Sequence, residues 1–339
     1  MPYEAELRHE GCRLRIVELA AAADGHLDRM PVTHRLLLEN VCRTASEGAD
    51  AARRALLAWL DRGTSLSEIP FLPGRILMHD TTCGPALVDI AAMRSAIAEA
   101  GGDAAALKPM LPVDVSTDHS VAVDVLGRAD AMQLNMAREM ERNAERYRLM
   151  KWAASALGIR VHPPGTGIMH TLNLERLATI VSVAGRNGDA WAVPDTLIGT
   201  DSHTPMINGI GVLAWGVGGI EAESVMFGIP TLLRIPDVVG VRMSGALREG
   251  VLATDLALSV TERLRQQALG DAFVEFFGPG ITSLSAGERA VVANMTPEFG
   301  GTTGYFPVDA ETLRYLLSRR AYVHIVLASC FHIFAGIGS

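Results

Sequence analysis

Apolar residues form two kinds of pattern along the chain, a helical spacing that predicts helices and short continuous runs that predict buried strands. Stretches with apolar side chains at helical spacing predict amphipathic helices over residues 34–62, 86–102, 131–158 and 254–270. Short apolar runs predict buried strands over residues 75–80, 235–245 and 273–278. Strands that alternate with helices are typical of an α/β protein with a mostly parallel sheet.

Polar clusters interrupt or follow these apolar stretches, and each cluster contains an acid, a histidine or both. The clusters are residues 114–120, 163–170, 199–203 and 294–304. In α/β proteins, the loops that leave the carboxyl ends of parallel strands carry the chemistry. We therefore expect the functional site where these four segments meet.

A glycine-rich run follows the third cluster and fits a relaxed dinucleotide-binding pattern, Gly209-Ile-Gly211-Val-Leu-Ala214. That fingerprint also needs a strand directly before it and an acid about 20 residues further on. The preceding residues are TDSHTPMIN, and the next acids, Glu221 and Glu223, come too soon. The run is therefore interpreted as a tight turn with close helix packing.

Composition and charge narrow the class of protein. The 339 residues are 49% hydrophobic and 20% charged, which is typical of a folded protein of two domains or one large α/β unit. The net charge of −8, without a long basic run, argues against a nucleic-acid groove. The N-terminus lacks the apolar core of a signal peptide, which predicts a cytoplasmic enzyme.

Residues 321–338 contain no Lys, Arg, Asp or Glu and come close to the length of a membrane span. His324 and His332 would be costly in lipid. The β-branched run AYVHIVLA favours a buried parallel strand, so we expect no membrane segment.

Three histidines in the polar clusters, His119, His170 and His203, suggest acid–base chemistry. Each alone is most often a satisfied turn histidine, but together they offer carboxylate–imidazole pairs. A mononuclear metal site is the rival interpretation, and the absence of His-x-His, His-x₃-His and HExxH spacing argues against it. The widely spaced Cys12, Cys42, Cys83 and Cys330 form no CxxC pair and support neither disulfides nor a thiolate zinc site. We expect no bound metal.

Long, ordered stretches of the chain resemble the aconitase family over most of residues 30–320. The matching stretches are RILMHD, GPALVDIAAMR, VSTDHSVAVD, MERNAERYRLMKWA, VHPPGTGIMHTLNLERLA, DTLIGTDSHTPMINGIGVLAWGVGGIEAES and VEFFGPGITSLSAGERAVVANMTPEFGGTTGYFPVDAETLRYL. The resemblance implies α/β/α layered domains with mostly parallel sheets. It places a first α/β domain at residues 1–236, and a second at 237–339 with a short remnant of a third.

The resemblance also implies a site for a di- or tricarboxylate. Its catalytic residues would be three pairs, Asp118 with His119, Asp201 with His170, and Glu298 with His203. Its substrate contacts would be Ser202, Asn294, Thr204 and His79, and His79 stands where aconitases more often have a glutamine. Arg75 and Arg142, from matched segments, are candidates to bind substrate carboxylates.

The sequence departs from the family at its cofactor. Aconitases hold a [4Fe–4S] cluster with one cysteine in a Ser-Cys-Thr-Asn motif and two in a later CxxC. Here Ser329-Cys330 is followed by Phe-His, and no CxxC is present. Because one thiolate cannot hold a cubane cluster, we expect no cluster and no other cofactor. We also expect this chain to lack the family's mobile C-terminal domain, which carries a serine base and several arginines.

These departures shape the expected function. Moving a proton beside a conjugated double bond demands less than expelling hydroxide without a Lewis acid. A cluster-free cis/trans aconitate isomerase is therefore the favoured interpretation. The alternatives are an aconitate hydratase-type hydro-lyase, cluster-free or completed by a partner chain, and a catalytically dead binding module. If that domain is absent, as expected, a homodimer is expected to cover the apolar face it would leave.

Overall fold

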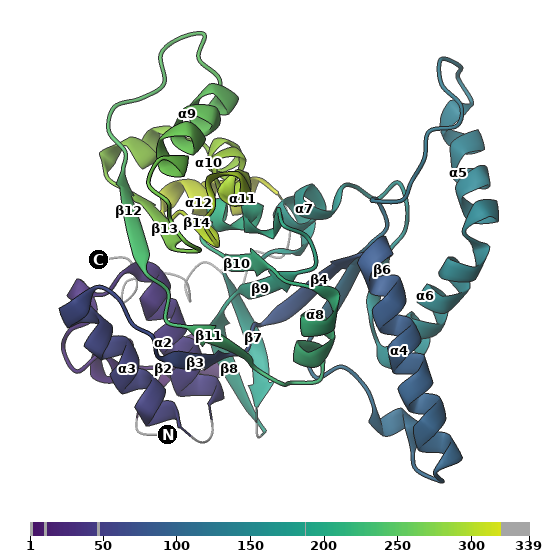
Figure 1. The fold of residues 1–339 in the computed structure, drawn as a ribbon, viewed down its shortest axis with the longest axis horizontal. Helices are drawn as coiled ribbons and strands as arrows, with labels where there is room; N and C mark the ends of the chain where they lie inside the picture. The colour runs from purple at the N-terminus through teal and green to yellow at the C-terminus, as the bar shows by residue number, and fades with distance from the viewer. Residues whose placement is uncertain (1–2, 10–11, 46–47, 187, 320–339) are drawn as a thin grey trace.

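The computed structural model describes residues 3–9, 12–45, 48–186 and 188–319 (Figure 1). Its strands are β1 (Glu4–His9), β2 (Cys12–Val17), β3 (Glu68–Phe71), β4 (Arg75–His79), β5 (Val113–Ser116), β6 (Arg160–His162), β7 (Val181–Arg186), β8 (Asp189–Pro194), β9 (Thr196–Gly199), β10 (Leu213–Gly216), β11 (Thr231–Arg234), β12 (Val238–Arg242), β13 (Phe273–Phe277) and β14 (Thr303–Tyr305).

Its α-helices are α1 (Leu19–Ala22), α2 (Val32–Thr44), α3 (Ala49–Arg62), α4 (Asp80–Glu99), α5 (Ala131–Arg142), α6 (Ala144–Leu157), α7 (Met169–Leu172), α8 (Gly219–Met226), α9 (Ala253–Arg265), α10 (Ala286–Asn294), α11 (Thr296–Phe299) and α12 (Ala310–Ser318). Shorter helical turns are η1 (Leu27–Arg29), η2 (Ala104–Ala106), η3 (Asn173–Leu177), η4 (Thr204–Ile210) and η5 (Pro279–Ser283).

A five-stranded parallel sheet in the order β10-β9-β4-β5-β6 lies at the centre of the molecule. Side chains alternate across it with the period of two that a strand requires. On β4, Ile76 and Met78 join the core cluster that contains Cys83 and Leu87 of α4. Leu77 joins the cluster on the other face, with η4 and α10. The sheet is therefore covered on both faces, as the layered α/β fold predicts.

Smaller sheets surround the central one. They have the orders β1-β2-β8-β7, β11-β3 and β12-β13-β14, and seven of the ten described pairings are parallel. The β12-β13-β14 sheet is attached to the rest through α10, which packs on η4, and through Tyr305, whose hydroxyl donates to the Gly211 carbonyl at 3.0 Å. The predicted division at residues 236/237 falls just before β12 and stays a prediction.

Two of the long predicted helices are interrupted. The stretch 34–62 forms α2 and α3, and α3 starts after Gly48, whose φ of +83° does not continue a helix. The stretch 131–158 forms α5 and α6, which are separated at Asn143 (φ −111°, ψ 26°). Apolar periodicity does not detect such breaks, because the apolar face resumes after them. The other predicted helices and strands are present with shifted ends.

The glycine-rich run is a structural turn, as predicted. Gly209 lies in η4, and Gly211 adopts a left-handed conformation (φ +86°) before β10. A Cβ atom on Gly209 would lie 2.5 Å from the amide nitrogen of Ala290. Close approach of α10 explains why glycine is needed there.

Replacing Gly209 by alanine is therefore expected to lower the free energy of unfolding by about 1–3 kcal/mol, because the backbone of α10 would have to move. Gly287, near the start of α10, is the matched control, since a Cβ there has only Ser285 Oγ at 4.0 Å. Urea unfolding of both alanine variants checks this. Equal stability of Gly209→Ala and Gly287→Ala would contradict the close packing.

A buried histidine in α2 makes stability depend on pH. His34 is fully buried, packs edge-on against Trp59 with ring centroids 4.4 Å apart, and its Nε2 lies 3.0 Å from the Pro236 carbonyl. Burial lowers the pKa of His34 to about 4, although that carbonyl and Asp237 oppose the shift. The folded state therefore keeps His34 neutral where the unfolded chain accepts a proton.

Because the pKa of His34 is lower in the folded state, its contribution to stability is present above the unfolded value of about 6.5 and is lost as the pH falls towards 4. We expect His34→Gln to remove about 2–3 kcal/mol of the loss in unfolding free energy between those pH values. Unfolding curves at several pH values measure it, with the exposed His26→Gln as control. Parallel pH profiles for wild type and His34→Gln would refute the assignment.

Residues 321–338, for which a buried strand was predicted, lie outside the described residues. Among the described helices, none combines the length and the apolar character needed to cross a membrane. The expected cytoplasmic location stays a prediction.

Candidate active site

The carboxyl ends of the central parallel strands bring the predicted histidines together. His79 is the last residue of β4, and the Asp118-His119 pair follows β5 within three residues. Asp201 and His203 follow β9. His170, on the short helix α7, belongs to the connection that leaves β6. Three of the four polar clusters, residues 114–120, 163–170 and 199–203, thus meet with His79 at one edge of the sheet, where α/β proteins place their ligands.

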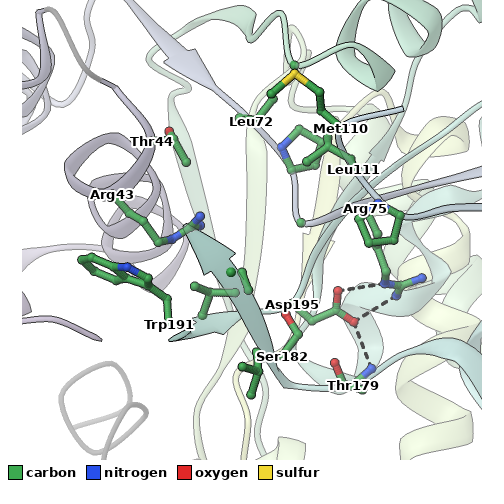
Figure 2. Close-up of a pocket in the computed structure, with 18 of the residues that line it drawn as sticks. Arg43, Thr44, Leu72, Arg75, Met110, Leu111, Thr179, Ser182, Trp191 and Asp195 are labelled. Atoms are coloured by element: carbon green, nitrogen blue, oxygen red, sulfur yellow. Dashed lines mark hydrogen bonds and ion pairs between the residues drawn. The ribbon is translucent and has the colours of Figure 1, made fainter. Parts of the chain in front are cut away.

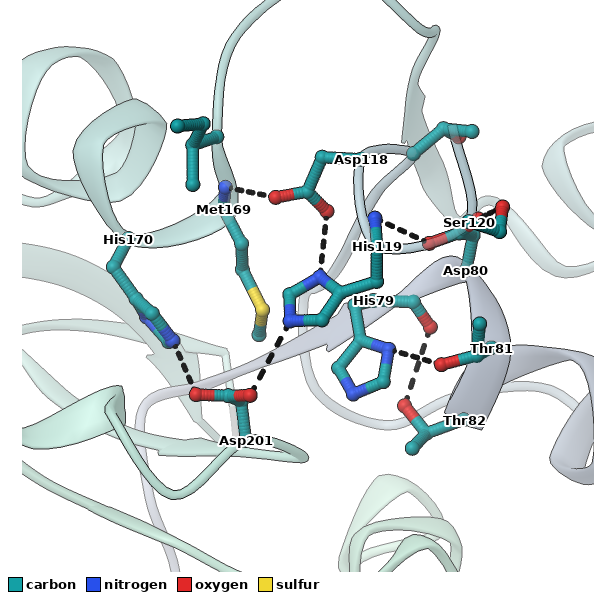
Figure 3. Close-up of polar contacts among 12 residues, drawn as sticks. His79, Asp80, Thr81, Thr82, Asp118, His119, Ser120, Met169, His170 and Asp201 are labelled. Carbon is teal, nitrogen blue, oxygen red and sulfur yellow. Dashed lines mark hydrogen bonds and ion pairs between the residues drawn. The ribbon is translucent and has the colours of Figure 1, made fainter. Parts of the chain in front are cut away.

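The structure forms all three carboxylate–histidine pairs that the resemblance implied. His119 Nδ1 lies 2.9 Å from Asp118 Oδ1, and His170 Nε2 lies 2.8 Å from Asp201 Oδ1 (Figure 3). The third pair joins the segment after β9 to α11, with His203 Nε2 3.0 Å from Glu298 Oε1. The catalytic roles of these residues stay predictions.

Asp201 is the centre of this arrangement. Besides His170, it accepts a hydrogen bond from the backbone amide of His203 at 2.7 Å, and its Oδ2 lies 3.3 Å from His119 Nε2. The hydrogen bond from His170 is the main cause that lowers the pKa of Asp201 far below its usual range, against the opposing effect of burial. Asp201 is therefore an ionised acceptor that links all three histidines.

His79 and His119 lie face to face, with ring centroids 3.9 Å apart and an interplanar angle of 15° (Figure 3). Burial, and then the neighbouring His119, lower the pKa of His79. Burial also disfavours charge on His119, but the carboxylates of Asp118 and Asp201 outweigh it and raise the pKa of His119. The two rings thus differ in their tendency to carry a proton.

A buried polar network under His119 was not predicted from the sequence. Asp80, at the start of α4, is almost fully buried and accepts from the His119 amide at 3.1 Å and from Arg146 Nη1 at 3.0 Å. Ser120 also donates to Asp80, and Glu139 accepts from Arg146 at 3.0 Å. The network fixes the loop after β5. The one feature of the sequence that pointed to this network was Asp80, which comes directly after a predicted buried strand.

The pairs differ in how open they are. The side chains of His203 and Glu298 are 39% and 36% exposed, whereas that of His170 is 10% exposed. Among the described residues, Glu298 Oε2 is buried and has no hydrogen-bond partner. The exposed fraction of the His203 side chain makes this pair more accessible to a ligand than His170, which is placed to orient Asp201.

The other predicted substrate contacts are placed unequally. Ser202 is exposed, and its hydroxyl lies 3.3 Å from His203 Nδ1. Asn294, the last residue of α10, is half-buried four residues before Glu298. Thr204 is fully buried and donates to the Asp201 carbonyl at 2.6 Å, so its hydroxyl is occupied within the loop.

The structure does not bring the predicted arginine contacts to these pairs. Arg75 is buried at the opposite end of β4, where it donates to Asp195 at 2.8 and 3.0 Å and to Asn173 at 2.9 Å. Arg142 pairs with Asp124 at 2.7 Å on α5, which projects from the body (Figure 1). Both guanidinium groups are therefore occupied by ion pairs with protein carboxylates, and neither lies where the predicted substrate contact would need it.

Arg75 and Asp195 line a cavity of about 580 Å³ together with Arg43 and Trp191 (Figure 2). The cavity lies at the amino end of β4, where Arg75 precedes His79 by four residues. Because a strand rises about 3.3 Å per residue, the two ends of β4 are well separated. It is therefore separate from the histidine–carboxylate site.

The described cysteines do not fit a cubane cluster. Burial raises the pKa of the Cys42 thiol to about 11 and that of Cys83 to about 12, so neither is a thiolate at neutral pH. Cys12 is exposed on β2, and no cysteine of the described residues belongs to a group of three ligand side chains. Cys330 lies outside the described residues. The expected lack of a cluster stays a prediction.

Relatives of this chain are aconitate hydratases. Aconitate hydratase A of Legionella pneumophila is 47% identical over 319 residues, covering 92% of this chain and 36% of the relative. The Escherichia coli enzyme of that name is 50% identical over 301 residues, covering 88% and 34%. That of Thermus thermophilus is 48% identical over 303 residues, covering 88% and 33%.

This chain thus spans about a third of the length of the curated relatives that it matches. The family model described as Aconitase family (aconitate hydratase) matches residues 55–332, which include every predicted site residue. The chain therefore belongs to the aconitase family.

Proposed function

We propose that this chain acts as a hydro-lyase of the aconitate hydratase type, adding water to an aconitate-type tricarboxylate or removing it. The observation that carries the proposal is the convergence of three histidine–carboxylate pairs at one edge of a parallel sheet. The names of the relatives support hydration over the cis/trans isomerisation first expected.

Dehydration needs two operations on neighbouring carbons. A base removes a proton from one carbon, and an acid assists hydroxide to leave the other. The base must be accessible to the substrate. Its partner must stabilise the positive charge that the base acquires with the proton. His203 meets both needs, because it is 39% exposed and Glu298 lies 3.0 Å from its Nε2. We assign His203 with Glu298 to the transfer of the proton at carbon.

We assign the opposite side of the site to the hydroxyl oxygen that leaves as water or adds to the double bond. There, His119 and His79 stack beside Asp201, whose carboxylate is held by His170. A polar, partly exposed group of imidazoles can receive hydrogen bonds from a hydroxyl or donate to it. The two assigned sides are joined through Asp201, which accepts from the backbone amide of His203 at 2.7 Å.

Proton NMR of the purified protein with cis-aconitate tests the proposal. Formation of citrate or isocitrate is the expected result. Formation of trans-aconitate alone would support the isomerase instead. Unchanged cis-aconitate would contradict both enzyme interpretations and favour a binding module. A parallel reaction in deuterium oxide would show a solvent-derived deuteron on carbon if His203 exchanges its proton with water.

A further inference from the structure

We propose that the cavity at the amino edge of the central sheet binds a small carboxylate with an apolar body. Its volume of about 580 Å³ lies in the range of sites that enclose small molecules. Its floor is formed where the central strands begin, by Arg75, Pro112, Arg160 and Asp195. The proposed function makes no use of this cavity, so the inference does not rest on it.

One face of the hairpin of β7 and β8 forms an apolar wall of the cavity. Trp191 and Val193 alternate along β8 and lie across from Ala184 and Ser182 of β7. Leu72 and Leu111, from the segments before β4 and β5, line the cavity as well. These side chains favour a ligand whose body is removed from water on binding.

Two guanidinium groups in the lining keep donors for a ligand. Arg43, in the last turn of α2, donates to Glu39 through Nε at 2.6 Å and Nη2 at 3.1 Å. Arg160 donates to Asp114 in the same way, at 2.9 and 2.5 Å. In the part of the chain that the structure describes, Nη1 of both arginines has no hydrogen-bond partner. Arg43 enters the cavity from α2, opposite Arg75 and Asp195 (Figure 2).

The carboxylates around the cavity, in contrast, are already satisfied. Asp195 accepts from Arg75 at both oxygens and from the Thr179 amide at 2.9 Å. Both oxygens of Glu39 and of Asp114 are bonded as well. The cavity therefore offers unused donors rather than unused acceptors. A carboxylate is the ligand group that a guanidinium donor recognises best.

Because each guanidinium is paired with a protein carboxylate, the cavity has little excess positive charge. Attraction of the ligand therefore depends on short contacts to Nη1 and on burial of its apolar body. This requirement selects a ligand that combines both features. A polycarboxylate without an apolar body would leave the wall of Trp191 and Val193 unused, so the proposed ligand differs from the substrate of the histidine–carboxylate site.

The test is isothermal titration calorimetry of the full chain with naphthoate, and with naphthamide as the uncharged analogue of the same shape. Naphthoate should bind at one site per chain. Naphthamide should bind at least about 10-fold more weakly, because hydrogen bonds between two charged groups are stronger than those to a neutral amide. An excess of cis-aconitate should not displace naphthoate.

Variants locate the bound naphthoate. Ala184→Phe fills the space beside Trp191 and should abolish binding. Ala190→Phe is the matched control on the same hairpin, because Ala190 is exposed and lies outside the lining. Arg43→Met combined with Glu39→Leu replaces a buried ion pair by apolar residues, a change that is often neutral for stability. It should weaken naphthoate about 10–100-fold and leave naphthamide unchanged.

Arg160→Met provides a second charge variant should the Arg43 and Glu39 double variant not fold, since the Arg160 side chain is 61% exposed. Circular dichroism shows which variants are folded. Absence of naphthoate binding by the wild type would overturn the proposal, as would equal affinity for naphthoate and naphthamide. Wild-type affinity in folded Ala184→Phe, or displacement of naphthoate by cis-aconitate, would place the ligand elsewhere and reject this cavity.

Discussion

Replacing His203 by glutamine is expected to lower kcat for aconitate hydration by about 10²–10⁴-fold while the protein stays folded. Loss of a general acid or base has this effect, which corresponds to about 3–5 kcal/mol of transition-state stabilisation. His203 is open to ligand and is paired with Glu298, so the proton it would exchange has a defined route. Glutamine keeps a polar side chain there but cannot titrate.

The controls separate catalysis from folding. Rates are measured per folded molecule, and thermal unfolding is recorded for each variant. His26→Gln, at an exposed position, should leave both unchanged. Because His203 and Glu298 are proposed to act as a unit, Glu298→Gln should lower kcat as well. The double variant should then lose much less than the product of the two single losses. Full activity of His203→Gln would reject its assignment.

The strand-end rule predicted from the sequence alone which histidine-containing segments lie close together. His119, His170 and His203 were selected because they follow apolar runs, and the structure places them at one edge of the central sheet. That inference works because parallel strands align their carboxyl ends whatever the length of the connections. The particular pairing with Asp118, Asp201 and Glu298 came from the resemblance to the family. Neither periodicity nor spacing specifies which carboxylate meets which imidazole.

The contact among His79, His119 and Asp201 shows what spacing rules do not detect. Spacing motifs detect residues that meet on one helix, whereas His79, His119 and Asp201 lie at or just after the ends of three different strands. His119 and Asp201 are 82 residues apart in the chain, yet their side-chain atoms are 3.3 Å apart. Strand order within a sheet creates this proximity. It is a tertiary property that the local pattern of residues does not contain.

The predicted substrate contacts of Arg75 and Arg142 differ from the structure for a related reason. A matched arginine was expected to bind a substrate carboxylate, but an arginine satisfies a buried protein carboxylate equally well. The strand-end rule places the site at the carboxyl end of a parallel strand, and Arg75 is the first residue of the strand predicted over residues 75–80. Arg75 begins the strand and His79 ends it, so the two lie at opposite edges of the sheet.

Arg75→Ala is accordingly expected to destabilise the protein by about 3–5 kcal/mol, the cost of leaving one partner of a buried ion pair uncompensated. The side chains of Arg75 and Asp195 are 9% and 2% exposed. Asp195 would keep only the Thr179 amide, at 2.9 Å, among the donors described here. Urea unfolding measures the loss. Arg142→Ala, which removes an exposed ion pair, should change stability by no more than about 0.5 kcal/mol.

A double variant separates the ion pair from a substrate contact. Replacing a buried pair by apolar residues is often neutral, so Arg75→Met with Asp195→Leu should recover most of the stability lost in Arg75→Ala. KM for the tricarboxylate should stay at the wild-type value in the recovered variant, because neither residue lies near the histidine–carboxylate pairs. A raised KM with unchanged stability in Arg75→Ala would instead return Arg75 to the substrate site. The two outcomes are exclusive, since the same guanidinium cannot be fully engaged by Asp195 and Asn173 and also bind a ligand.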